Sequence, residues 1–171
     1  DSHGQQQDED AQRQVRVLAH ERHAKRDAGH HDWCGKGDAR HVAAALDSGV
    51  VIHNFYVPAG GDKPDPEIND KFAHKLDFLR EMRDRFHAEP PERQILVGDL
   101  NIAPREDDVW SHKQLLKVVS HTPIEVEHLG QAQDAGRWVD VTRSHIPDGR
   151  LYSWWSYRSP DWNAADKGRR L

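Results

Sequence analysis

The sequence contains a single cysteine, Cys34, and no long run of apolar residues. One cysteine excludes an intrachain disulfide framework. No apolar run approaches the roughly 18 residues that a membrane-spanning helix requires, and the first residues lack the apolar segment of a secretory signal. These absences predict a protein that works in the reducing cytoplasm, without contact with a membrane.

The chain also lacks an excess of positive charge. Among its 171 residues 36% are apolar and 31% are charged, and the net charge is −5. This balance argues against a polycation that coats nucleic acid without specificity, although a local basic patch stays open. The length suits one domain with a sizeable core, which we expect to be monomeric.

Residues 1–31 are poor in large apolar side chains, with only Val15, Val17 and Leu18. Such a segment cannot bury enough surface to offset the entropy cost of ordering it. We therefore expect residues 1–31 to be disordered, weakly helical or foreign to the fold, and residues 32–171 to form the domain.

The patterns after residue 32 alternate between strand and helix. Two strand-like runs, Arg40–Leu46 and Val50–Tyr56, flank a turn of Asp, Ser and Gly, which predicts an antiparallel hairpin. Apolar residues then recur every three or four positions from Ile68 to Phe86, which predicts an amphipathic helix.

The second half of the chain repeats this mixture. A Thr-Pro start with a Glu three residues after the Thr resembles a capping box and predicts a helix from Thr122 to about Ala135. The aromatic run Leu151–Tyr157 is strand-like. Strands and helices in this order predict a mixed α/β architecture.

The stretch QILVGDLNIAP at residues 94–104 is central to the functional argument. Gln94–Val97 is expected to be a buried strand that delivers Asp99 and Asn101 to the sheet edge. Residues i and i+2 of an extended chain point to the same side, so both side chains could share one site. An ionised Asp can orient a water or hold a divalent cation, while an amide can contact a phosphate oxygen. The alternative is an Asx turn in which local backbone satisfies both side chains.

Aromatic residues offer further candidates. Tyr56 ends its strand before a Pro-Gly-Gly loop, so it could share a cleft with Asp99, although a lone Tyr is more often a packed residue. Trp154 and Trp155 are adjacent and fit either core packing or an apolar wall for an extruded sugar or base.

The last 35 residues carry a local excess of positive charge. Residues 137–171 contain seven Arg and Lys residues against four Asp residues, a balance of +3. Arg158 and Arg170 lie in this segment, which is compatible with an end that faces phosphate, although charged runs are usually solvated surface.

Four motifs in this order resemble bacterial exonuclease III, of the endonuclease/exonuclease/phosphatase superfamily. They are NFYVPAGG at residues 54–61, GDLNIAP at 98–104, YSWWSYRSPDW at 152–162 and ADKGRRL at 165–171. The resemblance runs from about Asp32 to Leu171. It implies a four-layered α/β sandwich of two mixed sheets, and Mg²⁺-dependent hydrolysis (with Mn²⁺ as a substitute) of double-stranded DNA at abasic sites and 3′ ends.

The resemblance also implies roles for individual residues. Asp99 would accept the proton of the attacking water or bind the metal, and Asn101 would hold the scissile phosphate or the metal. Tyr56 would lie against the phosphate. The substrate-binding residues would be Trp154, which lines the sugar pocket, together with Arg158, Arg170 and Leu171.

Complete members of that family carry further motifs that are not found in this sequence. These are an Asn on the first strand, a metal-binding Glu, an Asp after the segment that matches GRRL, and a terminal Asp-His pair. We therefore expect an interior part of such an enzyme. Two alternatives stay open: a catalytically inactive fragment that binds nucleic acid weakly, and a phosphatase of the same superfamily.

Overall fold

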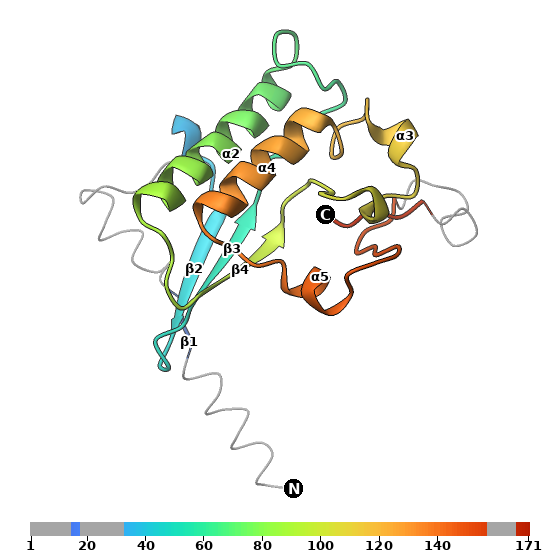
Figure 1. Cartoon of the computed structure of the whole chain (residues 1–171). Coiled ribbons are helices and arrows are strands. Elements are labelled where there is room, and N and C mark those ends of the chain that lie inside the picture. Colours follow the sequence, from blue (N-terminus) through green and yellow to red (C-terminus); the bar gives the residue numbers. More distant parts are fainter. Residues whose placement is uncertain (1–14, 18–32, 157–166) are drawn as a thin grey trace, which may run out of the picture. The chain divides into compact units, whose positions relative to one another are not determined.

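The computed structural model describes residues 15–17, 33–156 and 167–171 (Figure 1). The chain divides into two compact units. The first consists of Asp1–Tyr56 and Glu92–Gly98, and the second of Val57–Pro91 and Asp99–Leu171.

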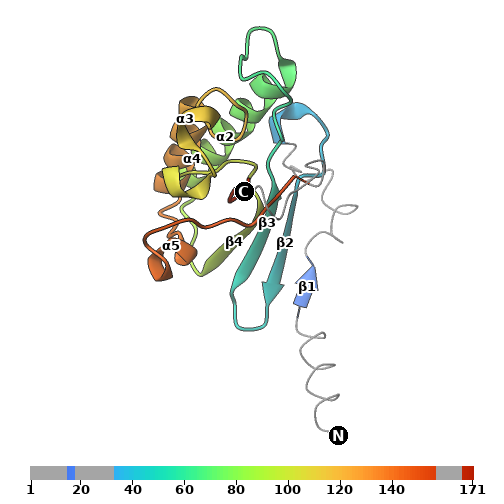
Figure 2. The same cartoon turned by 90° about the vertical axis from the view of Figure 1, so that its right-hand side faces the viewer.

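The first unit is built on a four-stranded sheet in the order β1-β2-β3-β4 (Figure 2). The strands are β1 (Val15–Val17), β2 (His41–Leu46), β3 (Val51–Tyr56) and β4 (Gln94–Asp99). The pairs β1–β2 and β2–β3 are antiparallel, which confirms the predicted hairpin.

The pairing of β3 with β4 is parallel. The Val51 amide donates to the Arg93 carbonyl at 3.1 Å, and the Val57 amide donates to the Asp99 carbonyl at 3.0 Å. Because the sequence offset between donor and acceptor is the same in both bonds, the two segments run in one direction. Antiparallel and parallel pairs together make the sheet mixed, which confirms the α/β fold class. The described residues form this one sheet, so the second sheet of the expected sandwich is not among them.

Three residues of the N-terminal segment pair with the sheet, while the prediction for residues 1–31 as a whole stays a prediction. Val15–Val17 pairs with Ala44–Leu46 as an antiparallel edge strand. A strand of three residues can pair here because the edge of β2 presents unpaired backbone donors and acceptors. The remaining residues of this segment lie outside the described part of the chain.

The prediction that Gln94–Val97 is a buried strand is wrong for half of its residues. Ile95 is 48% exposed and Val97 is 46% exposed, while Gln94 and Leu96 are half-buried. β4 lies at the edge of the sheet, and its side chains alternate between two faces. The face that carries Ile95 and Val97 has no covering layer among the described residues.

Gly98 allows β4 to approach β3 closely just before Asp99. Its φ is +130°, and a Cβ atom there would lie 2.0 Å from the Phe55 carbonyl oxygen. No L side chain fits this gap, so glycine is required where the strand delivers Asp99.

Aromatic and imidazole rings form the packed part of the first unit. The rings of His41 and Phe55, which are cross-strand partners, stack with centroids 4.2 Å apart. Trp33 packs edge-on against Phe55 at 5.2 Å. His41 Nε2 and His53 Nδ1 share a hydrogen bond of 2.8 Å. This cluster fixes the register of the hairpin that ends at Tyr56.

The second unit is built on two predicted helices, α2 (Asp70–Ala88) and α4 (Pro123–Ala135), which lie side by side (Figure 1). Shorter helices are α3 (His112–Leu115) and α5 (Val141–His145), with a 3₁₀ turn at Glu106–Asp108. None of the described helices combines the length and apolar character needed to cross a membrane. The buried residues of α2 are Phe72, Lys75, Leu76, Phe78, Leu79, Met82 and Phe86.

The start of α4 confirms the predicted capping box. Pro123 is the first helical residue, and the Thr122 amide donates to the Glu125 carboxylate at 3.0 Å. The Ser120 amide also donates to Glu125, at 3.0 Å. Glu125 is fully buried, so its carboxylate lies in the interior of the second unit while it caps the start of α4.

The prediction of a strand over Leu151–Tyr157 is wrong for its described residues. Only an isolated bridge joins Trp154 to Arg169. The amides of Ser153 and Trp154 both donate to the Arg169 carbonyl, each at 2.9 Å. Two successive amides that converge on one acceptor cannot continue a ladder, because successive groups of a strand point in opposite directions.

Candidate active site

Asp99 and Asn101 form a tight turn at the end of β4. The Asn101 amide donates to Asp99 Oδ1 at 2.9 Å, and Asn101 has a φ of +53°. This left-handed conformation is one that Asn tolerates better than most residues. The expected extended geometry from Asp99 to Asn101 is therefore wrong, and the Asx turn considered as the alternative is observed at Asp99, whose carboxylate accepts from the Asn101 backbone amide.

The Asn101 side chain is held in one orientation. Its Nδ2 atom donates to the Val57 carbonyl oxygen at 2.8 Å. A carbonyl can only accept, so this contact identifies the amide nitrogen and directs Asn101 Oδ1 away from Val57.

Two oxygens at this turn have no hydrogen bond within the described residues: Asp99 Oδ2 and Asn101 Oδ1. Both side chains are half-buried. A carboxylate oxygen and an amide oxygen are ligands that Mg²⁺ prefers, and Mg²⁺ usually takes the rest of its shell from water and substrate phosphates. The described residues include no group of three or more His, Cys, Asp or Glu that could hold a metal. An ion bound jointly with a substrate could use these two oxygens, and a metal at this turn stays a prediction.

Tyr56 ends β3 with its side chain 52% exposed. The Arg40 guanidinium lies over its ring at 5.3 Å from the centroid, and the Tyr56 amide donates to the Arg40 carbonyl. Tyr56 belongs to the first unit, whereas Asp99 and Asn101 belong to the second. Their sharing of one cleft stays a prediction.

A buried ion pair that sequence analysis missed lies behind the turn. Lys75 Nζ is 2.5 Å from Glu125 Oε1, and both side chains are fully buried. Lys75 Nζ also donates to the carbonyls of Asn101 at 2.8 Å and Ala59 at 3.3 Å. One signal could have revealed it, because Lys75 falls three residues after Phe72 on the apolar face of α2.

Burial lowers the pKa of Lys75 from its usual value, because desolvation disfavours the ammonium. The Glu125 carboxylate opposes this shift through its charge and its hydrogen bond, and the Asp99 charge opposes it to a smaller extent. Lys75 is therefore coupled electrostatically to the candidate site as well as bonded to its backbone.

Gly60 is packed against Lys75, so we expect Gly60→Ala to destabilise the protein by about 1–3 kcal/mol. Gly60 has a φ of +90°, and a Cβ there would lie 2.9 Å from Lys75 Cδ and 3.0 Å from Val119 Cγ1. Urea unfolding measures the change. Gly130→Ala is the matched control, because Gly130 lies in α4 with open space around it, and this change should stabilise slightly. Equal effects of the two changes would contradict the packing described for Gly60.

The expected substrate-binding residues lie in different surroundings. Trp154 is 37% exposed, with the Arg169 guanidinium 5.7 Å from its ring centroid. Leu171 is half-buried against the cluster of Ala103, Val109 and Leu115. Arg158 lies outside the described residues.

Arg170 is bonded within the protein. Its guanidinium donates to both carboxylate oxygens of Asp140, at 2.6 and 2.7 Å, and to Asp108 at 3.2 Å. Arg143 donates to the other Asp108 oxygen at 2.5 Å. Asp108 is fully buried, so these two Arg residues neutralise it. Contact between Arg170 and DNA stays a prediction, and part of the C-terminal excess of positive charge is compensated internally.

The Asp140–Arg170 pair predicts a loss of stability in acid. Burial alone would raise the pKa of Asp140, but hydrogen bonds from Arg170 and the Arg143 amide lower it below its usual 3.8. The stabilisation is therefore present above about pH 4 and is lost as the pH falls through the lowered pKa. We expect Asp140→Asn to be less stable than wild type at pH 7 and to lose less stability between about pH 4 and pH 2.

Thermal unfolding across this pH range measures the effect, with the exposed Asp148→Asn as control. Parallel pH profiles of the wild type and the Asp140→Asn variant would contradict the assigned role of the pair.

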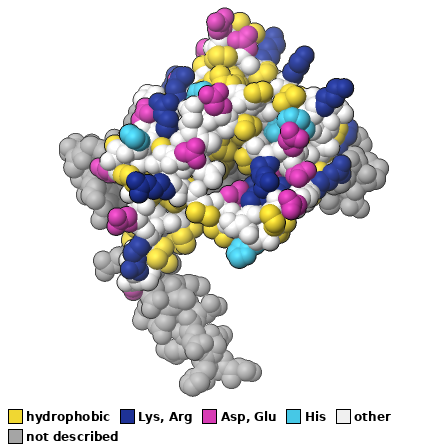
Figure 3. All heavy atoms as spheres, viewed as in Figure 1, with side chains coloured by type: hydrophobic (Ala, Val, Ile, Leu, Met, Phe, Trp, Pro, Cys, Tyr) yellow, Lys and Arg dark blue, Asp and Glu magenta, His cyan; other side chains and the backbone are white. Residues whose placement is uncertain are grey.

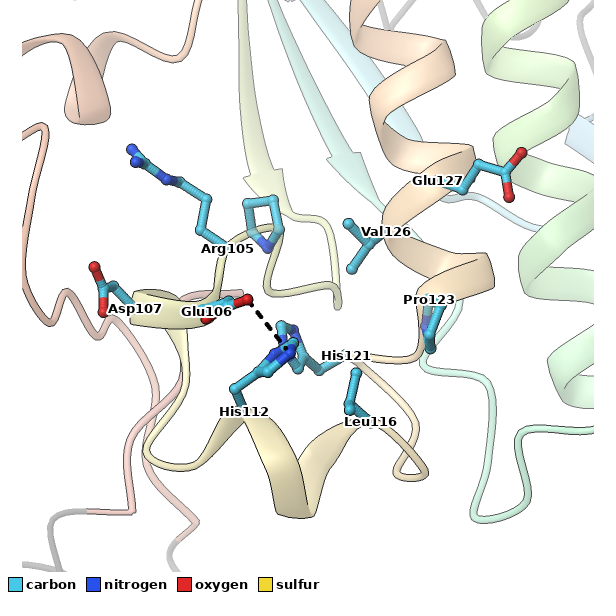
Figure 4. Close-up of a pocket in the computed structure, with 10 residues that line it drawn as sticks. Arg105, Glu106, Asp107, His112, Leu116, His121, Pro123, Val126 and Glu127 are labelled. Atoms are coloured by element: carbon cyan, nitrogen blue, oxygen red, sulfur yellow. Dashed lines mark hydrogen bonds and ion pairs between the residues drawn. The ribbon is translucent and has the colours of Figure 1, made fainter.

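A pocket of about 610 Å³ lies between the 104–107 loop, α3 and the start of α4 (Figure 4). His112 Nδ1 and His121 Nε2 are 2.8 Å apart, and His121 Nδ1 is 2.7 Å from the Ala103 carbonyl. The carbonyl makes His121 Nδ1 a donor, so in neutral His121 Nε2 accepts from His112. Glu106 lies 3.5 Å from His112 Nε2. Sequence analysis did not single out these residues.

Acidic and basic side chains are interspersed on the face shown in Figure 3. This mixture agrees with the net charge of −5.

The mixed α/β fold of this chain is similar to the fold of AP endonucleases and exonuclease III-like enzymes of the endonuclease/exonuclease/phosphatase superfamily. An AP endonuclease from Archaeoglobus fulgidus is similar at a TM-score of 0.68 and 26% identity, over 77% of this chain and 49% of that one. A 3′-5′ exonuclease, NExo, from Neisseria meningitidis is similar at a TM-score of 0.71 and 21% identity, over 92% of this chain and 55% of that one. The resemblance predicted from the motifs is thus confirmed at the level of the fold.

A structure described as the 3′ phosphatase NExo from Neisseria, bound to a product DNA hairpin, is similar at a TM-score of 0.69 and 23% identity, over 83% of this chain and 55% of that one. No protein-family profile and no curated protein matches the chain. The chain spans about half the length of these structural neighbours.

Proposed function

We propose that this chain forms part of a metal-dependent hydrolase that cleaves phosphodiester bonds of double-stranded DNA at abasic sites or 3′ ends. The observation that carries the proposal is the turn at Asp99 and Asn101, where two oxygens have no hydrogen bond to any described residue. The ordered motifs and the fold similarity to DNA-repair nucleases support the same conclusion.

Each residue of the turn has a distinct task in this proposal. Asp99 Oδ2 accepts a proton from the attacking water, since Oδ1 is engaged by the Asn101 amide. Asn101 keeps Oδ1 and the second hydrogen of Nδ2 for a metal or a phosphate oxygen, because only one Nδ2 hydrogen is directed at Val57. A bound Mg²⁺ or Mn²⁺ would stabilise the negative charge that develops on the phosphate.

The remaining residues would bind the substrate. Tyr56 would lie against the phosphate, and Trp154 would line the sugar pocket beside Leu171. Arg158 and Arg170 would approach the DNA backbone, which for Arg170 requires that it exchange or share its bonds to Asp140.

Incision of a duplex with one abasic analogue tests the proposal. This chain and the complete open reading frame that contains it are each incubated with the duplex in Mg²⁺, and then with EDTA. We expect metal-dependent incision at the analogue. Absence of incision by both proteins would refute the proposal.

A second candidate is a phosphatase that removes a 3′ phosphate from DNA. The description of NExo both as a 3′-5′ exonuclease and as a 3′ phosphatase favours it. Two substrates distinguish the candidates: a DNA hairpin that ends in a 3′ phosphate, and the duplex with an internal abasic analogue. A phosphatase releases inorganic phosphate from the hairpin and leaves the abasic duplex intact.

A third candidate is a catalytically inactive chain that binds nucleic acid weakly. The local excess of positive charge in residues 137–171 would carry such binding. A gel-shift titration at several salt concentrations tests it, because binding through phosphate contacts weakens steeply as salt rises. Metal-dependent turnover by this chain would rule it out.

A further inference from the structure

Lys75 is the only described lysine with a fully buried side chain, and its ammonium touches the backbone of two loops. One is the loop that carries Asn101, where Nζ donates to the Asn101 carbonyl at 2.8 Å. The other follows β3, where Nζ donates to the Ala59 carbonyl at 3.3 Å. Lys75 therefore joins α2 to two segments. One contains Asn101, and the other follows β3 and contacts the Asn101 side chain through the Val57 carbonyl.

A third contact fixes the ammonium itself. Glu125 Oε1 lies 2.5 Å from Nζ, and the Glu125 carboxylate also accepts from the amides of Ser120 and Thr122 and from the Thr122 hydroxyl. These donors belong to Thr122, the N-cap of α4, and to Ser120, which lies two residues before it. A carboxylate with so many directed donors cannot move, so it defines where the Lys75 ammonium lies.

Stability alone does not account for this arrangement. A buried ion pair costs desolvation energy, and a well-packed apolar pair of similar volume is often as stable or more so. What an apolar pair cannot supply is two directed donors to the Asn101 and Ala59 carbonyls. These donors hold the Asn101 backbone in its left-handed conformation, with a φ of +53°, which Asn tolerates better than most residues but which glycine adopts more freely.

We propose that Lys75 is a positioning residue, which acts through the Asn101 and Ala59 carbonyls to hold the Asn101 amide against Val57 and its backbone N–H against Asp99. Glu125 supports it by fixing the ammonium. Lys75 has no contact with the substrate in this role. The positioning role rests on the proposed function, whereas the restraint of Asn101 can be measured without it.

The test uses the double variant Lys75→Met/Glu125→Gln. Met keeps the length of the lysine stem without its donors, and Gln keeps an acceptor for the helix start, so the pair is removed without leaving a buried charge. Hydrogen exchange of the Asn101 amide, followed by NMR, reports its bond to Asp99. We expect exchange at Asn101 to accelerate at least about tenfold, the scale set by losing hydrogen bonds to a charged group, with a shift of the Asn101 side-chain amide signals.

Met82→Ala is the matched control, because Met82 is also buried in α2 but has no part in the Lys75 contacts. Loss of its packing should lower stability while leaving the Asn101 side-chain signals in place. Unchanged exchange and unchanged signals in the double variant would overturn the proposal. Equal changes at Asn101 in the control would also overturn it, because Lys75 would then act only through general stability.

The kinetic arm uses the complete open reading frame and the abasic duplex. We expect the double variant to lower kcat by about 10²-fold, the effect of a misplacement of about 1 Å, with KM within about twofold of wild type. Unchanged kcat despite altered exchange would overturn the positioning role. If the wild type shows no incision, the proposed function fails, and the exchange data still decide whether Lys75 orders Asn101.

Discussion

Asp99→Asn should lower turnover of an abasic duplex by about 10²- to 10⁴-fold, the usual contribution of general-base assistance. Asn keeps the size of Asp and the Oδ1 acceptor for the Asn101 amide, so the turn should survive. The change removes the negative charge and the basic oxygen that we assign to the attacking water. Affinity for DNA should be retained or should rise, because repulsion of the phosphates falls.

Single-turnover kinetics, with circular dichroism of the same samples, separates the two roles of Asp99. Asp134→Asn is the control, because Asp134 is exposed at the end of α4 and its variant should match wild type. A folded Asp99→Asn variant with near-normal turnover would remove Asp99 from the mechanism. An unfolded variant would show that Asp99 is needed mainly to cap the turn.

Lys75→Met alone should destabilise the protein by about 3–5 kcal/mol, because it leaves the Glu125 carboxylate buried without its partner charge. Adding Glu125→Gln should restore much of this loss, since no uncompensated charge is then buried. Chemical denaturation of the wild type, both single variants and the double variant gives the coupling between the two residues.

Lys71→Met is the matched control for this cycle. Lys71 lies one turn before Lys75 in α2 and its side chain is exposed, so its replacement should change stability by no more than about 0.5 kcal/mol. A loss at Lys75 as small as that at Lys71 would contradict a charged, paired Lys75 in the folded protein.

The elements that depend on contacts between residues close in the sequence were predicted correctly. The capping box of Thr122 and Glu125 correctly located the start of α4, because its hydrogen bonds span only three residues. The turn at residues 47–49 correctly located the hairpin. The spacing of apolar residues identified α2.

Features that depend on contacts between residues far apart in the sequence were not predicted. Glu125 is 50 positions from Lys75 in the sequence, so no local pattern predicts their pairing. The pair forms because α2 packs against α4. The same holds for the aromatic run after Leu151, where Arg169 accepts two successive amides and prevents a ladder. Asn101, which has a positive φ, is bonded at its side chain by Val57 and at its carbonyl by Lys75, and both partners are distant in the sequence.

Mn²⁺ titration of the ¹⁵N-labelled chain, followed by NMR, tests most directly whether the turn at Asp99 and Asn101 is a metal-binding site. Mn²⁺ accepts the same oxygen ligands as Mg²⁺ and broadens the signals of nuclei near it. We expect selective broadening of the Asn101 backbone and side-chain signals in the wild type, and its loss in Asp99→Asn. Broadening that is confined to the acidic turn Glu106–Asp108, or that persists unchanged in Asp99→Asn, would contradict the account.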